Sequence, residues 1–211
     1  MAQYFSIHPV NPQRRLIHQA AEIISHGGVV AYPTDSSYAL GCSIGNKEAM
    51  NRIRAIRKVG EDHNFTLVCK DLSELSIYAK VDNDIYRLLK RFTPGPYTFI
   101  LAATGEVPRR LQNPKRRSIG LRVPDFRIVE LLLGELNEPL MSSTLIMPGE
   151  TLPLNDAEQI RQALEHEIDL VIDGGPCDFQ PTSVVDLISG IPNVRRVGKG
   201  DVSTFISSTH G

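Results

Sequence analysis

The sequence has few of the residues that build disulfide scaffolds or metal proteins. It contains three cysteines, Cys42, Cys69 and Cys177, and no Cys-x-x-Cys pair. Three widely spaced cysteines cannot form a disulfide framework or a four-ligand zinc site. The six histidines are scattered along the chain. The sequence therefore predicts a protein of a reducing compartment that has no resident metal and no tightly bound cofactor.

Long hydrophobic runs and a strong net charge are also missing. No apolar stretch approaches the ~20 residues of a membrane span, and the N-terminal segment has no small-residue cleavage pattern. The formal net charge is −1, so overall charge indicates no polyanionic partner, and any nucleic-acid contact must depend on local clustering. We expect a cytoplasmic protein without membrane contact.

The 211 residues suit one domain, residues 1–211. Asn11 and Pro12 have the residue types of a helix cap and a first turn. Hydrophobic spacing predicts helices at about 12–26, 46–57, 72–79, 85–92, 128–134 and 157–167. It predicts strands at about 29–32, 65–69, 97–102, 118–123, 140–146, 170–172, 183–187 and 194–197. This alternation predicts an α/β fold with a twisted, mixed parallel and antiparallel sheet and flanking helices.

A cluster of small polar residues follows the first of these strands. Pro33 stops the strand, and Thr34, Asp35, Ser36 and Ser37 come next. In α/β sheets ligands bind beyond the carboxyl ends of the strands, so these hydroxyls are candidate binding groups. A plain turn built from good turn formers accounts for the same residues.

Residues 107–124 carry charge of one sign. The segment has no Asp or Glu, and its cations are Arg109, Arg110, Lys115, Arg116, Arg117 and Arg122. An arginine guanidinium can bind a phosphate through two hydrogen bonds. The first five of these cations are therefore candidates for RNA contact. The alternative is a solvated loop. Arg122 differs because it ends an apolar strand, where a partly buried cation needs an anionic partner.

A third stretch joins two predicted strands near the C-terminus. Gly174 and Gly175 follow a strand, and Thr182 and Ser183 open the next one. Glycines at a strand end allow a ligand to approach the backbone closely. A simple connecting loop is the alternative. No phosphate-binding loop of the GxxxxGK[ST] type and no GxGxxG motif is present.

Six elements in this order resemble the threonylcarbamoyl-AMP synthase family, which has the YrdC-like fold, and most closely its YciO branch. The likeness spans about Ile7 to Phe205. The elements are Pro33-Thr34 with Tyr38 and Gly41, Pro94-Gly95-Pro96-Tyr97-Thr98, Arg122-Val123-Pro124, the strand end near Thr144, Gly174-Gly175 with Thr182 to Asp186, and Arg196-Val197-Gly198.

The resemblance implies a basic concave face and a reaction. Family members join threonine, bicarbonate and ATP into threonylcarbamoyl-AMP and pyrophosphate for the modification of adenosine 37 in tRNA, with Mg²⁺ expected to accompany ATP. Some bind double-stranded RNA. The implied threonine contacts are Thr34, Arg122 and Thr182. The implied nucleotide contacts are Lys58, Thr98, Thr144 and Arg196, and the implied catalytic residues are Lys58 and Arg122.

The chain departs from the family pattern in two motifs. The family's Lys-x-Arg is matched by Lys58 but has Gly60 in the arginine position, and its Ser-x-Asn ends here in Ile146. Without these two polar side chains, transition-state binding is weaker by about 3–6 kcal/mol, on the order of 10²- to 10⁴-fold. Arg54 and Arg57 lie near Lys58 in the sequence and are candidates to supply the missing charge.

Three functions therefore stay open on the sequence. The first is a synthase of this type with weakened activity. The second is a paralogue that binds tRNA, double-stranded RNA or a nucleotide without efficient synthesis. The third is a hydrolase of a related adenylate.

Overall fold

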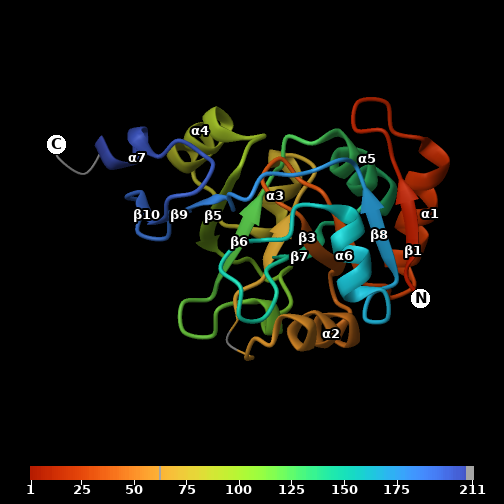
Figure 1. Ribbon diagram of the computed structural model, residues 1–211. Coiled ribbons are helices and arrows are strands. Elements are labelled where there is room, and N and C mark those ends of the chain that lie inside the picture. Colours follow the sequence, from red (N-terminus) through yellow and green to blue (C-terminus); the bar gives the residue numbers. More distant parts are fainter. Residues whose placement is uncertain (62, 208–211) are drawn as a thin grey trace.

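A mixed sheet of ten strands forms the centre of the computed structural model, which describes residues 1–61 and 63–207 (Figure 1). The strand order is β1-β8-β2-β3-β7-β4-β6-β5-β9-β10. The pairs β1–β8, β2–β8, β4–β6 and β5–β9 are parallel, and the other five pairs are antiparallel. The strands are β1 (Gln3–Ser6), β2 (Val30–Tyr32), β3 (Ala39–Ser43), β4 (Thr66–Val68), β5 (Tyr97–Ala102), β6 (Ser118–Arg122), β7 (Leu140–Thr144), β8 (Leu170–Asp173), β9 (Ser183–Asp186) and β10 (Asn193–Arg196).

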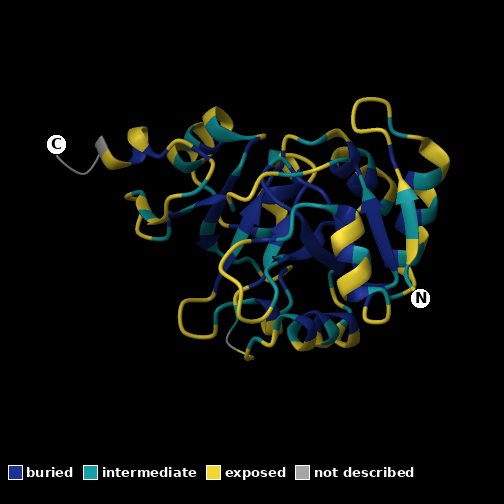
Figure 2. Cartoon of the chain, in the orientation of Figure 1, coloured by how far each residue is buried: buried dark blue, intermediate teal, exposed yellow. Residues whose placement is uncertain are grey.

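The helices turn one face to the sheet and leave the other in solvent, as the burial colouring of Figure 2 shows for α2 and α6. Among the described residues, no helix is long and apolar enough to cross a membrane. The helices are α1 (Arg14–Ser25), α2 (Lys47–Arg57), α3 (Leu72–Tyr78), α4 (Asn83–Phe92), α5 (Arg127–Leu136), α6 (Ala157–Leu164) and α7 (Ser203–Ser207), with a 3₁₀ turn at Arg109–Leu111.

Side-chain caps fix where four of the helices begin. Asn46, Asp71, Asp82 and Asp156 each accept a hydrogen bond from the main-chain N–H three residues later. The first predicted helix forms as α1, but its predicted start and its Asn11 cap were wrong, because α1 begins at Arg14 and no side chain caps it. The segment before it turns back instead, since the Val10 and Asn11 amides donate to the His8 ring.

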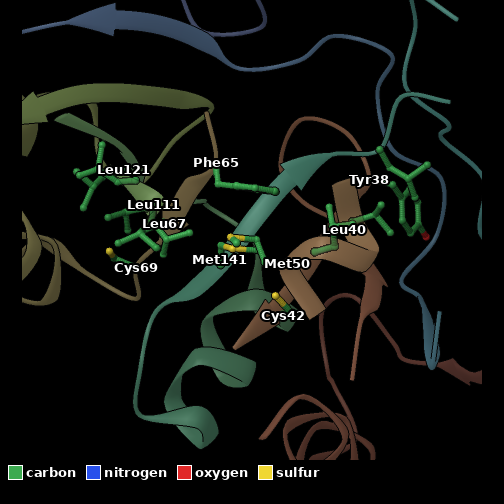
Figure 3. Packing of buried hydrophobic residues seen from close by; sticks show 14 of the residues in the cluster. Tyr38, Leu40, Cys42, Met50, Phe65, Leu67, Cys69, Leu111, Leu121 and Met141 are labelled. Carbon is green, nitrogen blue, oxygen red and sulfur yellow. The ribbon is translucent and has the colours of Figure 1, made fainter. Parts of the chain in front are cut away.

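Alternating residues divide the core into two layers. One layer packs α1 and α5 against β2 and β8, with Val30 and Tyr32 fully buried in it. Val29 and Ala31 face the other, larger layer, which α2, α3, α4, α6 and α7 help to cover. Figure 3 shows this layer from close by, with Met50 of α2 and Met141 of β7 among its labelled residues.

Two strands escape prediction from the sequence. β3 reads ALGCS, whose small residues have little β-propensity. It forms because it pairs with both β2 and β7. β1 pairs with β8, which lies far away in the sequence. No local sequence pattern predicts β1. Long-range pairing overrides local propensity in both cases.

Candidate functional site

A cavity of about 340 Å³ opens on the face of the sheet formed by β4 to β7 and β9. Register places Ile100, Gly120, Thr66 and Ser142 in one row across four neighbouring strands. Residues opposite one another in register point to the same side of a sheet, and all four line the cavity. Its floor is therefore built of one isoleucine, one glycine and two hydroxyl side chains.

The neighbouring row of the same strands is apolar and points the opposite way. Phe99, Leu121, Leu67 and Met141 are paired in register, and each is at most 1% exposed. Three of them are labelled in the packed layer of Figure 3. Because these two rows alternate along the strands, one face of the strands is buried and the other faces the cavity.

Gly120 keeps the floor of the cavity low. A Cβ atom at this position would lie 3.2 Å from the Thr66 hydroxyl oxygen and 3.2 Å from the Thr98 methyl group. Any longer side chain would extend from this tight position into the open space. The glycine thus provides part of the cavity's volume.

Four arginines point into this cavity from four different elements. Arg57 ends α2, Arg116 lies in the β5–β6 connection, Arg122 ends β6 and Arg196 ends β10. The lining includes no Asp or Glu among the described residues. An uneven charge of this kind in a partly enclosed space attracts carboxylates and phosphates.

Arg57 is held at the end of β7. Its Nη1 donates to the Ser143 hydroxyl at 2.9 Å and to the Thr144 carbonyl, and burial lowers the pKa of its guanidinium. The next residue, Lys58, takes a left-handed conformation (φ 47°) that ends α2, and its side chain is exposed outside the lining. The structure therefore brings Arg57, and not Lys58, to the cavity.

Arg122 is 7% exposed and forms an ion pair with Asp35. The other oxygen of Asp35 accepts a hydrogen bond from the Asp125 amide at 2.9 Å. The anion that the sequence argument required for Arg122 is thus supplied by the chain itself. The buried Arg122 Nε has no hydrogen-bond partner, so the guanidinium is not fully satisfied.

Thr34 does not line the cavity and is 3% exposed. Its hydroxyl donates to the Ser37 carbonyl at 2.7 Å and lies 3.1 Å from the Ser36 hydroxyl. Of the polar cluster after β2, only Ser37 lines the cavity. The rest of the cluster makes a turn that holds Arg122 through Asp35 and Ser36.

Thr98, Thr182 and Arg196 form a connected group on the opposite wall. The hydroxyls of Thr98 and Thr182 are 2.8 Å apart. Arg196 donates from Nη2 to the Thr182 hydroxyl at 3.1 Å and from Nε to the Thr182 carbonyl at 2.9 Å. Burial and the charge of Arg122 together lower the pKa of Arg196. An anion between these arginines would relieve that repulsion.

The basic segment divides between the cavity and the surface. Arg116 lines the cavity and forms an ion pair with Asp186 at 2.6 Å. Arg110 donates to the Gly45 carbonyl and is exposed. Arg109, Lys115 and Arg117 are exposed as well and do not line the cavity.

Thr144 and Ile146 line the cavity at the far end of β7. Sequence reasoning missed several of their neighbours as site residues: His63, Asn64, Thr66, Ser142 and Ser143. The alternation of Ser118, Gly120 and Arg122 with Ile119 and Leu121 in strand 118–122 is a signal for the open face, whereas strand 140–144 (LMSST) does not alternate.

A Gly-x-Ser-x-Gly sequence spans Gly41 to Gly45 but does not form a hydrolase elbow. The Ser43 hydroxyl donates to the Glu138 carboxylate, and among the described residues no hydrogen bond joins it to a histidine. A serine nucleophile needs a neighbouring base to accept its proton. Elsewhere in the described chain, no group of three or more His, Cys, Asp or Glu side chains gathers as metal ligands would.

Proteins similar over almost the whole chain carry the name YciO or none. The chain is 58% identical over 207 residues to an uncharacterized protein of Haemophilus influenzae, with 98% of this chain and 100% of that protein covered. It is 54% identical over 206 residues to YciO of Escherichia coli K12, again with 98% and 100% covered. The crystal structure of E. coli YciO superposes with a TM-score of 0.94 over 97% of this chain and 100% of that one.

More distant relatives have a named activity. A threonylcarbamoyl-AMP synthase of Coxiella burnetii is 29% identical over 177 residues, which cover 82% of this chain and 94% of that enzyme. Pyrococcus abyssi Sua5, solved in complex with L-threonine, shares the fold at 23% identity with a TM-score of 0.89, over 98% of this chain and 61% of that one. The model of the Sua5/YciO/YrdC family, described as telomere recombination, matches residues 22–198. The chain therefore belongs to the Sua5/YciO/YrdC family.

Proposed function

We propose that the protein forms an acyl-adenylate from threonine, bicarbonate and ATP, as threonylcarbamoyl-AMP synthases do, at a rate below that of those enzymes. The observation that carries the proposal is the convergence of Arg57, Arg116, Arg122 and Arg196 on a cavity whose described lining has no carboxylate. No ion pair among the described residues involves Arg57 or Arg196. These two cations therefore have no acidic partner of their own in the described chain, whereas Arg116 and Arg122 each have one.

The reaction needs positioned charge more than it needs a nucleophilic side chain. The threonine amine combines with bicarbonate to give a carbamate, with loss of water. A carbamate oxygen then attacks the α-phosphorus of ATP while the bond to pyrophosphate breaks. Both partners are anions, so arginines that hold them together lower the barrier by orientation and charge neutralisation.

The residues that line the cavity suggest which part of the ligand each wall would bind. Arg122 and Thr182 would hold the threonine end, and Thr98, Thr144 and Arg196 the nucleotide, which would bring Mg²⁺ with it. Arg57 would take the contact that the sequence suggested for Lys58, because Arg57 lines the cavity and Lys58 does not. We assign no ligand contact to Thr34. The apolar Ile146 in the lining supports a reduced rate.

The proposal predicts that purified protein releases pyrophosphate from ATP only when threonine and bicarbonate are both present. Arg196→Gln should lower kcat/KM by about 10- to 100-fold, since it removes a charged group that holds the ligand. Arg87→Gln is the control. Its side chain is 79% exposed, pairs with Asp84 and does not line the cavity, so its kcat/KM should stay within about twofold, as for an ordinary surface substitution.

Two results would reject this function. Pyrophosphate or phosphate release without a threonine requirement would favour the hydrolase of a related adenylate. An equal decrease in the Arg87 and Arg196 variants would show that the cavity is not where the reaction takes place.

The exposed part of the basic segment supports a second candidate, binding of tRNA or double-stranded RNA. Replacing Arg109, Arg110, Lys115 and Arg117 with glutamine should weaken RNA binding and flatten its salt dependence, by roughly 0.7–0.9 in the slope for each phosphate that the variant no longer neutralises. Fluorescence anisotropy over a series of salt concentrations measures this slope for tRNA and for an RNA duplex.

A control for this experiment removes the same charge elsewhere. Arg14, Arg15, Arg87 and Lys90 are exposed on α1 and α4, and their replacement by glutamine should leave the slope nearly unchanged. Equal slopes for both fourfold variants would show that the segment is not the contact surface.

A further inference from the structure

Asp186 is an acidic residue beside a cationic cavity. It pairs with Ile100 in register, so it continues the row of Ile100, Gly120, Thr66 and Ser142 onto β9. Its side chain is 3% exposed. A carboxylate next to an anion site repels the ligand, so its presence at the end of this row needs a reason.

The Asp186 carboxylate accepts hydrogen bonds from two arginines, Arg116 and Arg195. Its Oδ2 accepts from Arg116 Nη1 at 2.6 Å and from Arg195 Nε and Nη2 at 3.2 and 2.9 Å. Its Oδ1 accepts from the Ile188 amide at 3.2 Å. Burial opposes the charge of Asp186, but these bonds outweigh it and lower the pKa of the carboxyl. Asp186 is thus a fixed anion.

Arg116 needs such an anchor because it comes from a turn. Its own backbone N–H bonds the Asn113 side chain at 3.1 Å, and its neighbours Lys115 and Arg117 are exposed. The Arg116 side chain is 41% exposed and yet lines the cavity. A long exposed side chain samples many rotamers, and holding it in one costs entropy. The bond to Asp186 holds it over the cavity.

We propose that Asp186 is a positioning residue that aims the Arg116 guanidinium at an anionic group of the ligand, a carboxylate or a phosphate. Arg116 touches the ligand, and Asp186 acts through it. The inference deepens the proposed function and rests on it for the identity of the ligand as a nucleotide. The geometry that carries it is the buried carboxylate in the cavity row, bonded at 2.6 Å to a cation that lines the same cavity.

The test is the affinity of ATP with Mg²⁺, and of inorganic pyrophosphate, for the full chain by calorimetry. Asp186→Asn removes a negative charge beside an anion site. If Asp186 does not position Arg116, this substitution tightens binding, because the repulsion between the carboxylate and the anionic ligand is removed. If Asp186 positions Arg116, the substitution weakens binding, by about 3- to 10-fold, since an arginine bond to an anion is worth up to about 10- to 100-fold. The two roles predict changes of opposite sign.

A double-mutant cycle adds a second readout that a structural role would not produce. Arg116→Gln should weaken binding by about 10-fold or more. In that background Asp186→Asn should cost nothing further, because no guanidinium remains to be aimed. Arg116→Lys should recover part of the affinity, and Arg87→Gln, which breaks an exposed pair with Asp84, should change it less than about twofold. Melting temperatures of all variants separate folding from binding.

Each outcome decides the inference. Tighter or unchanged binding by Asp186→Asn would overturn it, as would equal effects of Asp186→Asn with and without Arg116. Absence of binding of both probes to the wild-type chain would overturn it too. Binding that follows the cycle, together with no threonine-dependent pyrophosphate release, would reject the proposed function and leave this inference standing.

Discussion

Replacing Arg122 with methionine is expected to lower the free energy of unfolding by about 3–5 kcal/mol. The reason is the Asp35 carboxylate, whose side chain is 9% exposed and which would be left without its cation. An unpaired buried charge is far more costly than the pair itself. A domain of this kind has about 5–15 kcal/mol of stability in total, so the variant should unfold at a clearly lower urea concentration.

Two controls separate the effect of the ion pair from the effect of packing. Asp35→Asn combined with Arg122→Met removes both charges, and it should recover much of the stability because no buried charge is left. Arg127→Met breaks an exposed pair with Glu130, whose side chains are 49% and 56% exposed, and should cost less than about 1 kcal/mol. A double variant as unstable as Arg122→Met would show that the charge of Asp35 is not the cause.

The same ion pair shows how far the sequence could be interpreted. A cation at the end of an apolar strand predicts a buried partner, and this expectation holds for Arg122. The identity of the partner does not follow, since Asp35 lies far away in the chain and reaches Arg122 only through the pairing of ten strands. Local patterns reveal that a partner is required, and topology decides which residue it is.

The candidate site residues that the sequence placed on strands line the cavity more often than the candidates at helix ends and in turns. Thr98, Arg122 and Thr144 lie on strands, where alternation fixes the direction of each side chain, and all three line the cavity. Arg57 and Lys58 are adjacent at the end of α2, and a left-handed residue there turns the second away. At a helix end, a shift of one residue decides whether a side chain faces the cavity or the solvent. Sequence patterns do not locate helix ends to one residue.

Replacing Gly198 with alanine is expected to lower both stability and ligand affinity. A Cβ at Gly198 would lie 2.6 Å from the carbonyl carbon and oxygen of Thr182, and closer still to the Pro181 carbonyl oxygen. These are backbone atoms of the segment entering β9 and cannot rotate away, so the chain after β10 must move outward. Overpacking and the broken hydrogen bonds together should cost about 2–4 kcal/mol of unfolding free energy.

An outward movement of the chain after β10 would also disturb the cavity, because Arg196 lies two residues before Gly198. The Gly198 amide donates to the Ser183 hydroxyl at 2.9 Å, and the Lys199 amide to the Pro181 carbonyl at 2.9 Å. When these bonds break, Arg196 loses its place against Thr182, and ATP affinity should fall by about 10-fold or more. Gly134→Ala is the control, since a Cβ in this exposed turn of α5 meets nothing within 4 Å and should stabilise the helix by about 0.5–1 kcal/mol. Wild-type stability and affinity in Gly198→Ala would mean that β10 is not packed on β9 in this way, and would remove Arg196 from the cavity wall.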